Sequence, residues 1–136
     1  MEKISNGPDI TESLGFDFSN KIGKGSIVTI EGDIGAGKTT FIKGILKGFG
    51  YNGNVNSPTY TLINEYEMDN KIIHIDCYRE QDIARWIDIG IIDYLNKDNI
   101  IIIEWPKYIR RILPNNTIDI YIDHISESQR RIRIAS

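Results

Sequence analysis

Hydrophobic residues in the first part of the chain follow a helical spacing and then a strand-like run. Apolar side chains recur at every fourth position: Ile10, Leu14, Phe18 and Ile22. This spacing predicts a helix near 9–22, and Asp9, with Glu12 three residues later, has the capping-box spacing that would begin it. Glycines follow, and the run SIVTI at 26–30 is typical of a short buried strand.

A glycine-rich stretch, GDIGAGKTT, separates that strand from a second expected helix. The apolar residues after the stretch share one helical face: Phe41, Ile42, Ile45 and Leu46. Gly48 and Gly50 are expected to end this helix, because glycine is the usual residue just beyond a helix C-terminus. The local order is therefore strand, glycine loop, helix.

Short strand-like runs dominate the second half of the chain. They lie at 61–66, 71–76, 99–105, 118–125 and 131–135. The first two are separated by MDN, which suits a hairpin, and the last two alternate strictly and are joined by SESQ, which predicts a closing antiparallel hairpin on the sheet. Between these pairs, the apolar spacing of 81–95 predicts a helix interrupted near Gly90.

Composition bounds the class of protein. A chain of 136 residues has room for one domain, and its 40% hydrophobic and 26% charged residues are typical of a folded globular protein. The net charge of -3 argues against nucleic-acid binding through bulk electrostatics. The single cysteine, Cys77, excludes an internal disulfide. The longest apolar run, Ile100 to Ile103, is too short for a membrane helix and no secretion signal begins the chain, so a cytoplasmic protein is expected.

The glycine-rich stretch carries the first chemical signal. Four residues fit the phosphate-binding pattern G-x-x-x-x-G-K-[ST]: Gly32, Gly37, Lys38 and Thr39. Glycines let backbone N–H groups turn inward around a β-phosphate, and the helix that follows presents its positive N-terminus to the same anion. Lys38 would neutralise the β- and γ-phosphates, the Thr39 hydroxyl would ligate Mg²⁺, and Thr40 would reach the α-phosphate. The alternative is a plain strand-to-helix turn with an exposed lysine.

Two acids at strand ends are candidate metal or catalytic residues. Asp76 ends KIIHID, and Glu104 follows four isoleucines. Burial of a carboxylate is costly unless something pairs with it, so Glu104 is interpreted as a metal ligand, with a cap or salt bridge as the alternative. Asp76 is interpreted as a residue that binds the metal through water or orients the attacking water.

Other polar residues nearby are ambiguous by themselves. SPTYT, Ser57 to Thr61, follows the phosphate helix, where many P-loop proteins carry a switch that senses the γ-phosphate. The same residue types also form ordinary loops. His74, Tyr78 and Arg79 flank Asp76, and a strand histidine is more often packed and hydrogen-bonded than catalytic.

Five segments together resemble the TsaE family in order and approximate spacing: GDIGAGKTTFIKG, SPTYTLINEY, HIDCYR, GIIDYL and IEWP. That family is the small ATPase of the bacterial machinery that makes threonylcarbamoyladenosine in tRNA. The resemblance implies a single P-loop NTPase-like α/β domain over 1–136, three-layered, with a mainly parallel sheet and antiparallel hairpin additions. It also implies slow hydrolysis of ATP with Mg²⁺ and attachment to a TsaB–TsaD complex, which would be the only link to tRNA.

The resemblance assigns roles to individual positions. Residues implied to bind the nucleotide are Thr11, Gly32, Asp33, Gly35, Ala36, Gly37, Lys38, Thr39, Thr40, Trp105 and Arg130. Residues implied to ligate the metal are Thr39, Asp76 and Glu104, and those implied to act in catalysis are Lys38, Thr61, Asp76 and Glu104. Thr11 and Arg130 would lie near the adenine and ribose. Glu80 stands where the family usually has leucine, which would alter a partner surface.

Three other functions are open at this stage. A small-molecule kinase is one, because Arg110 and Arg111 suggest a phosphate-gripping lid, although the chain has no insertion of lid length. A GTPase-type switch is another, because NKDN at 96–99 approaches the guanine-reading pattern N-K-x-D with its aspartate one position early. The third is a scaffold that holds a nucleotide without hydrolysing it.

Overall fold

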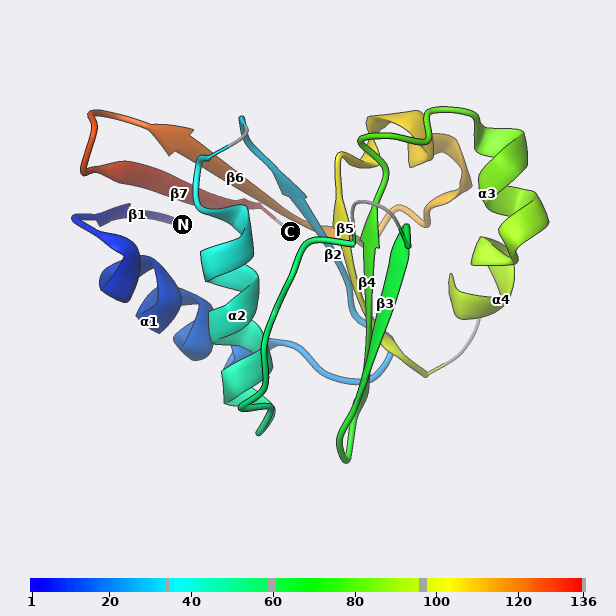
Figure 1. The fold of residues 1–136 in the computed structure, drawn as a ribbon, viewed down its shortest axis with the longest axis horizontal. Helices are drawn as coiled ribbons and strands as arrows, with labels where there is room; N and C mark the ends of the chain where they lie inside the picture. The colour runs from blue at the N-terminus through cyan, green and yellow to red at the C-terminus, as the bar shows by residue number, and fades with distance from the viewer. Residues whose placement is uncertain (34, 59–60, 96–97, 136) are drawn as a thin grey trace.

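The computed structural model describes residues 1–33, 35–58, 61–95 and 98–135 (Figure 1). Its strands are β1 (Glu2–Ser5), β2 (Ile27–Glu31), β3 (Ile63–Glu67), β4 (Lys71–Asp76), β5 (Ile100–Glu104), β6 (Ile118–His124) and β7 (Arg130–Ala135). Its helices are α1 (Pro8–Phe18), α2 (Lys38–Gly48), α3 (Ile83–Ile89) and α4 (Ile91–Leu95), with single 3₁₀ turns η1 (Ser19–Lys21), η2 (Pro106–Tyr108) and η3 (Arg110–Ile112). No helix within the described ranges is long and apolar enough to cross a membrane.

The strands form one sheet in the order β1-β7-β6-β2-β5-β4-β3. The four central strands, β6, β2, β5 and β4, are parallel, whereas the pairings of β1 with β7, β7 with β6, and β3 with β4 are antiparallel. The expectation of a mainly parallel sheet therefore holds for the centre. Of the two expected hairpins, β3–β4 lies at one edge of the sheet, and β6–β7 lies beside β1, the strand at the other edge. Since the central strands run in one direction, their C-terminal ends meet at one edge of the sheet.

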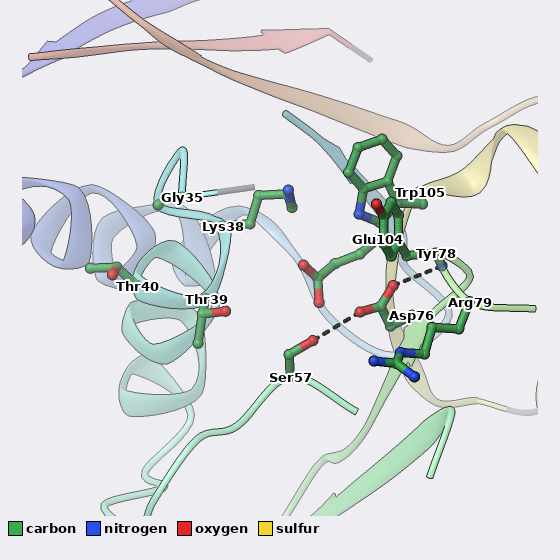
Figure 2. Close-up of a pocket in the computed structure, with 11 residues that line it drawn as sticks. Gly35, Lys38, Thr39, Thr40, Ser57, Asp76, Tyr78, Arg79, Glu104 and Trp105 are labelled. Carbon is green, nitrogen blue, oxygen red and sulfur yellow. Dashed lines mark hydrogen bonds between the residues drawn. The ribbon is translucent and has the colours of Figure 1, made fainter. Parts of the chain in front are cut away.

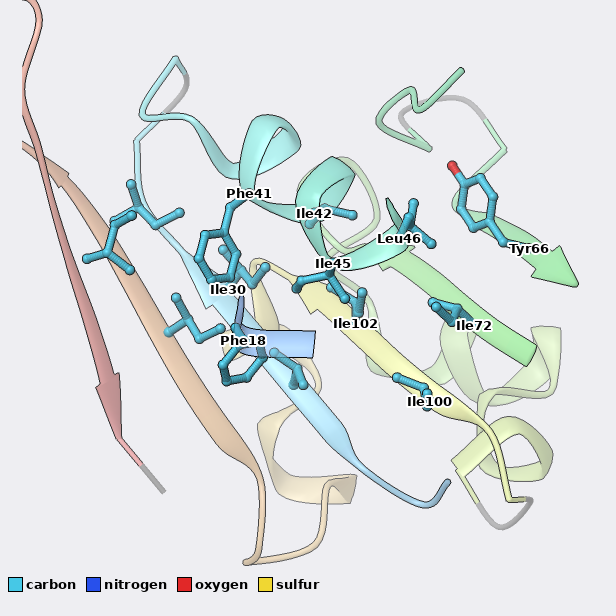
Figure 3. Packing of buried hydrophobic residues seen from close by; sticks show 14 of the residues in the cluster. Phe18, Ile30, Phe41, Ile42, Ile45, Leu46, Tyr66, Ile72, Ile100 and Ile102 are labelled. Atoms are coloured by element: carbon cyan, nitrogen blue, oxygen red, sulfur yellow. The ribbon is translucent and has the colours of Figure 1, made fainter. Parts of the chain in front are cut away.

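Helices cover both faces of this sheet and enclose two separate cores. On β5, Ile100 and Ile102 pack with α1 and α2, whereas Ile101 and Ile103 pack with α3 and α4. All four side chains are buried, as expected for a central parallel strand. Figure 3 shows the first core, in which Phe41 and Ile45 of α2 pack against the sheet. The three-layer α/β arrangement is therefore confirmed.

Helices α1 and α2 approach each other closely because glycines lie at their contact. A Cβ atom placed on Gly15 would lie 2.2 Å from the carbonyl oxygen of Phe41, and one on Gly44 would lie 2.0 Å from that of Glu12. Neither distance is tolerated by a real side chain. The close approach holds α2, and with it the glycine-rich loop before α2, in a fixed position on the sheet.

Two details differ from the sequence prediction. The first helix begins at Pro8, not at Asp9, and its N-cap Gly7 makes no side-chain capping bond. Proline favours the first helical position because it has no N–H to leave unpaired. Glu12 is therefore not part of a capping box and instead pairs with Lys43 and Lys47 of α2, at 3.5 and 2.8 Å. The second difference is the edge strand β1, which the sequence did not indicate. The predicted interruption at Gly90 is confirmed, with φ of 101° between α3 and α4.

Candidate functional site

The glycine-rich loop connects the end of β2 to the start of α2. Gly35 and Gly37 have positive φ angles of 82° and 103°, which side chains rarely adopt, so the loop can turn as it does only with glycine at these positions. Gly37 is the N-cap of α2, and its carbonyl accepts the first helical hydrogen bond from the Phe41 N–H at 3.0 Å. The N–H groups before Phe41 have no partner within the helix, which leaves them for an anion.

Lys38 lies against this loop. Its ammonium donates to the carbonyl oxygens of Gly32 and, at 3.1 Å, of Asp33, and it lies 4.8 Å from the ring centroid of Trp105. Burial lowers the pKa of Lys38, and the negative charges of Glu104, Asp76 and Asp33 oppose that shift. The lysine is 8% exposed, so its charge is directed into the interior of the site and not into solvent.

A cavity of about 520 Å³ opens between the start of α2 and the C-terminal ends of β4 and β5 (Figure 2). Its lining residues are Gly35, Gly37, Lys38, Thr39, Thr40, Ser57, Asp76, Tyr78, Arg79, Glu104 and Trp105. Positively charged side chains, carboxylates and hydroxyl groups therefore line the same cavity. Eight of the residues that the resemblance implies line this cavity.

Asp76 and Glu104 lie side by side at the ends of neighbouring parallel strands. They are opposite each other in the register of β4 and β5 and are 7% and 2% exposed. Asp76 accepts hydrogen bonds at both of its oxygens, from the Ser57 hydroxyl at 2.8 Å and from the Tyr78 backbone N–H at 2.9 Å. These bonds fix the orientation of the Asp76 carboxyl group at the cavity wall.

Glu104 contacts a histidine beneath the cavity. His74 Nε2 lies 2.7 Å from Glu104 Oε2, and the His74 side chain is completely buried. In the register, His74 is opposite Ile102, so His74 and Glu104 are diagonal neighbours on one face of the sheet. The other ring nitrogen, His74 Nδ1, has no hydrogen-bond partner in the part of the chain that the structure describes.

The oxygen groups at this wall suit a hard divalent cation. Among residues 1–33, 35–58, 61–95 and 98–135, no cluster of three or more His, Cys, Asp or Glu side chains could hold a metal. The available groups are two buried carboxylates and the Thr39 hydroxyl in the first turn of α2. Mg²⁺ is usually bound by one or two carboxylates, substrate phosphates and several waters, so these residues fit Mg²⁺.

Aromatic residues form another wall of the cavity. Trp105 directly follows β5 and has a φ of 55°, a left-handed conformation uncommon for a tryptophan. Its ring packs against that of Tyr78, with centroids 4.9 Å apart. Arg79 lines the same cavity beside Tyr78 (Figure 2). The residues after β4 and after β5 therefore meet at the mouth of the site.

A second cavity, of about 390 Å³, adjoins the first and shares Gly35, Gly37 and Thr40 with it. Thr11 and Arg130 line this second cavity. The Thr11 hydroxyl is buried and lies 2.7 Å from the Ser5 hydroxyl, whereas Arg130 Nε donates to the Ala36 carbonyl at 3.2 Å. The structure thus brings both ends of the chain to the glycine-rich loop.

The structure adds detail on two residues of these motifs, Thr61 and His74. Thr61 is exposed, donates to Asn64 Oδ1 at 3.0 Å and does not line the described cavity, whereas Ser57 of the same segment does. His74 was ambiguous from sequence, although the alternation of KIIHID places it on the same face as Asp76. That alternation is the one signal that could have placed the histidine beneath the site.

Two sequence features suggested a kinase or a GTPase: the pair Arg110 and Arg111, and the segment NKDN. Arg110 pairs with Asp119 at 3.1 Å, and neither residue lines the cavity at the glycine-rich loop. Of the guanine-like segment NKDN, residues 96 and 97 lie outside the described residues.

Comparison with known proteins identifies the family. The family model "Threonylcarbamoyl adenosine biosynthesis protein TsaE" matches residues 5–132. The chain is 45% identical over 107 residues to the tRNA threonylcarbamoyladenosine biosynthesis protein TsaE of Haemophilus influenzae, covering 78% of this chain and 68% of that protein. It is 30% identical over 135 residues to TsaE of Treponema pallidum, covering 99% and 100% of the two chains.

A solved structure has the same fold. The crystal structure of Bacillus subtilis YdiB superposes with a TM-score of 0.83 at 28% identity, covering 97% of this chain and 82% of that one. The match therefore extends over nearly the whole chain and not over the glycine-rich loop alone. With the family model spanning nearly every described element, the chain belongs to the TsaE family.

Proposed function

We propose that this chain is a P-loop NTPase-like protein that binds ATP with Mg²⁺ and hydrolyses it during the biosynthesis of threonylcarbamoyladenosine in tRNA. The observation that carries the proposal is the convergence of Lys38, Asp76 and Glu104 on one cavity at the glycine-rich loop. The family membership supplies the pathway. The arrangement of Lys38, Asp76 and Glu104 around the cavity supports ATP hydrolysis with Mg²⁺.

The loop and the first turn of α2 would bind the phosphates. The backbone N–H groups in the first turn of α2 face the cavity. The dipole of α2 also favours an anion at this end of the helix. Lys38 would exchange its contacts with the loop carbonyls in part for the β- and γ-phosphates. Thr11 and Arg130, in the adjoining cavity, would contact the nucleoside.

Glu104 and the Thr39 hydroxyl would hold the cation, with Asp76 contacting it through water or orienting the attacking water. Bound there, Mg²⁺ would supply positive charge against the developing charge on the phosphates. Asp76 is suited to orienting water because Ser57 and the Tyr78 N–H already fix its carboxyl group. These groups are positioned before any ligand arrives, so little reorganisation is needed during the reaction.

The expected partner is the TsaB–TsaD complex, and hydrolysis would allow that complex to turn over. The chain would be a weak ATPase alone and a faster one in the complex. This division follows from the family resemblance, and the acidic net charge of -3 agrees with a protein that contacts tRNA only through its partners.

An ATPase assay tests the proposal. Phosphate release is measured for the protein alone, with TsaB and TsaD, and with both plus tRNA, in Mg²⁺ and in EDTA. We expect slow release that rises with TsaB–TsaD and disappears in EDTA or with Glu104→Ala. Phosphate release that stays at background in every mixture, or is unchanged by Glu104→Ala, would overturn the ATPase function.

A further inference from the structure

We infer that His74 is a positioning residue: it donates a hydrogen bond through Nε2 to Glu104 Oε2 and so holds this carboxyl group in place to bind the cation. The inference rests on the proposed function, because it gives a role to a residue beneath the proposed magnesium site. The observation behind it is the 2.7 Å contact between His74 Nε2 and Glu104 Oε2, in which both side chains are buried.

The environment of Glu104 requires such a partner. Its side chain is 3% exposed, and an ionised carboxylate with neither a partner nor water is costly to bury. Before a cation binds, the contact with His74 is the hydrogen bond that compensates this burial in the described structure. Lys38 also lines the cavity, but its ammonium is directed to the carbonyls of Gly32 and Asp33.

The second nitrogen of the imidazole supports the direction of this bond. His74 Nδ1 is buried and has no partner among the described residues. A neutral imidazole has one N–H and one bare nitrogen. If the proton were on Nδ1, the ring would bury an unpaired N–H and face the carboxylate with a lone pair. With the proton on Nε2, it donates to Glu104, and the group left unpaired is an acceptor.

The sheet fixes this contact. His74 and Glu104 come from β4 and β5, and their diagonal positions follow from the register that pairs Asp76 with Glu104. Ile72 and Ile102 pack on the same face in the first core. The imidazole therefore has little freedom to move, and Oε2 of Glu104 stays bound beneath the site while Oε1 remains for the cation. Figure 2 shows the Glu104 carboxyl group directed between Lys38 and Asp76.

Two variants separate the hydrogen bond from packing. His74→Leu fills a similar volume without a donor, and His74→Gln places an amide nitrogen the same number of bonds from the backbone as Nε2. Ile102→Val is the matched control, because Ile102 is buried directly opposite His74 and makes no polar contact. Calorimetry measures the affinity of each protein for the non-hydrolysable analogue AMP-PNP in Mg²⁺ and in EDTA, and the ratio of the two affinities is the magnesium effect.

We expect His74→Leu to reduce the magnesium effect about 10- to 100-fold, the usual range for loss of a residue that orients a metal ligand. Its affinity for AMP-PNP in EDTA should equal that of the parent. His74→Gln should restore most of the effect, and Ile102→Val should retain all of it. A His74→Leu protein that folds and shows the parental magnesium effect overturns the inference, as does an equal loss in Ile102→Val.

Two further outcomes are decisive. If His74→Leu does not fold, His74→Gln is compared with His74→Asn, whose amide is one bond too short to reach Oε2, and an equal magnesium effect in the two overturns the inference. If Mg²⁺ does not strengthen AMP-PNP binding by the parent, the proposed magnesium site itself is wrong, and the role of His74 is wrong with it. A normal parent with an unaffected His74→Leu contradicts the inference alone.

Discussion

The Ser57 hydroxyl donates a hydrogen bond of 2.8 Å to Asp76 Oδ2 and so joins the segment after α2 to the end of β4 (Figure 2). The two residues are 19 positions apart in the sequence. The bond places a hydroxyl group at the cavity wall and orients the acid that we propose to act on water. It therefore links the conformation of this segment to the geometry of the site.

Ser57→Ala should lower the free energy of unfolding by about 1.5–3 kcal/mol, because a hydrogen bond to a charged group is lost. Hydrolysis should also fall, since Asp76 would keep only the bond from the Tyr78 N–H among those described above. Urea unfolding and phosphate release measure the two effects. Ser57→Thr, which retains the hydroxyl, is the control; equal stability of Ser57→Ala and the parent would contradict the prediction.

Asp76→Asn should leave ATP affinity close to that of the parent and reduce hydrolysis. The amide keeps the size of the side chain but is a poorer acceptor for a proton from water, so we expect a loss of about 100-fold or more. Calorimetry gives the affinity and phosphate release gives the rate. Asp93→Asn, at an exposed position on α4, is the matched control. A parental rate for Asp76→Asn would show that Asp76 has no part in the reaction.

Lys38→Ala should weaken ATP binding by at least about 100-fold, since charge-assisted hydrogen bonds contribute roughly 1.5–3 kcal/mol each. Lys43→Ala is the matched control, because Lys43 lies in the same helix but is exposed. It pairs with Glu12 at 3.5 Å, away from the loop. Calorimetric titration with ATP compares the two variants. Similar affinities for Lys38→Ala and Lys43→Ala would refute the assignment of the phosphate loop.

Asp119 should make stability depend on pH. Burial raises the pKa of Asp119, but hydrogen bonds from Thr29, Arg110 and Thr117 outweigh burial and lower it below its usual value. A lowered folded-state pKa stabilises the fold above the unfolded-state pKa, and this stabilisation is lost as pH falls through the folded-state value.

The test compares Asp119→Asn with the parent by urea unfolding at pH 7 and near pH 3. At pH 7 the variant should be less stable by about 1.5–3 kcal/mol, the size of one hydrogen bond to a charged group. The difference should shrink as the pH falls below the unfolded-state pKa, because protonation of Asp119, first in the unfolded chain and then in the folded protein, removes the stabilisation. A difference that is constant with pH would exclude this linkage.

Gly15→Ala should destabilise the fold by about 1–3 kcal/mol or more, the cost of forcing extra volume into a packed contact. The added methyl group would meet the carbonyl of Phe41 and push α1 away from α2. Gly23→Ala is the matched control, because a Cβ there meets nothing within 4 Å. Thermal and urea unfolding of both variants measure the effect, and equal stabilities would mean that the two helices can separate without cost.

Much of the fold could be predicted because local patterns and the tertiary structure agree. The isoleucine run of β5 is buried on both faces, as a continuous apolar strand should be, and the glycine at 90 interrupts its helix as expected. The start of α1 was placed wrongly because the sequence spacing of Asp9 and Glu12 fits a capping box, although the helix begins at Pro8. Only the three-dimensional position of α2 shows that Glu12 pairs with lysines there.

The candidate site was predictable in part. The phosphate-loop motif, with acids at strand ends, indicated Lys38, Asp76 and Glu104, and these three line one cavity. Sequence does not determine that Ser57 donates to Asp76 whereas Thr61 donates to Asn64. The contact between His74 and Glu104 depends on the register of two strands that are far apart in sequence, and periodicity alone gives no register.

The position of Trp105 beside Lys38 should make its fluorescence sensitive to the glycine-rich loop. One of its two tryptophans, Trp86, is completely buried in the core beneath α3 and donates to the Glu80 carbonyl at 2.7 Å, so its surroundings are constant. The other, Trp105, has the Lys38 ammonium 4.8 Å from its ring centroid. A cation that close perturbs the indole electronically. Any ligand that draws Lys38 away from the ring will change the emission of one fluorophore against the steady signal of the other, so the loop can be followed in real time without a dye.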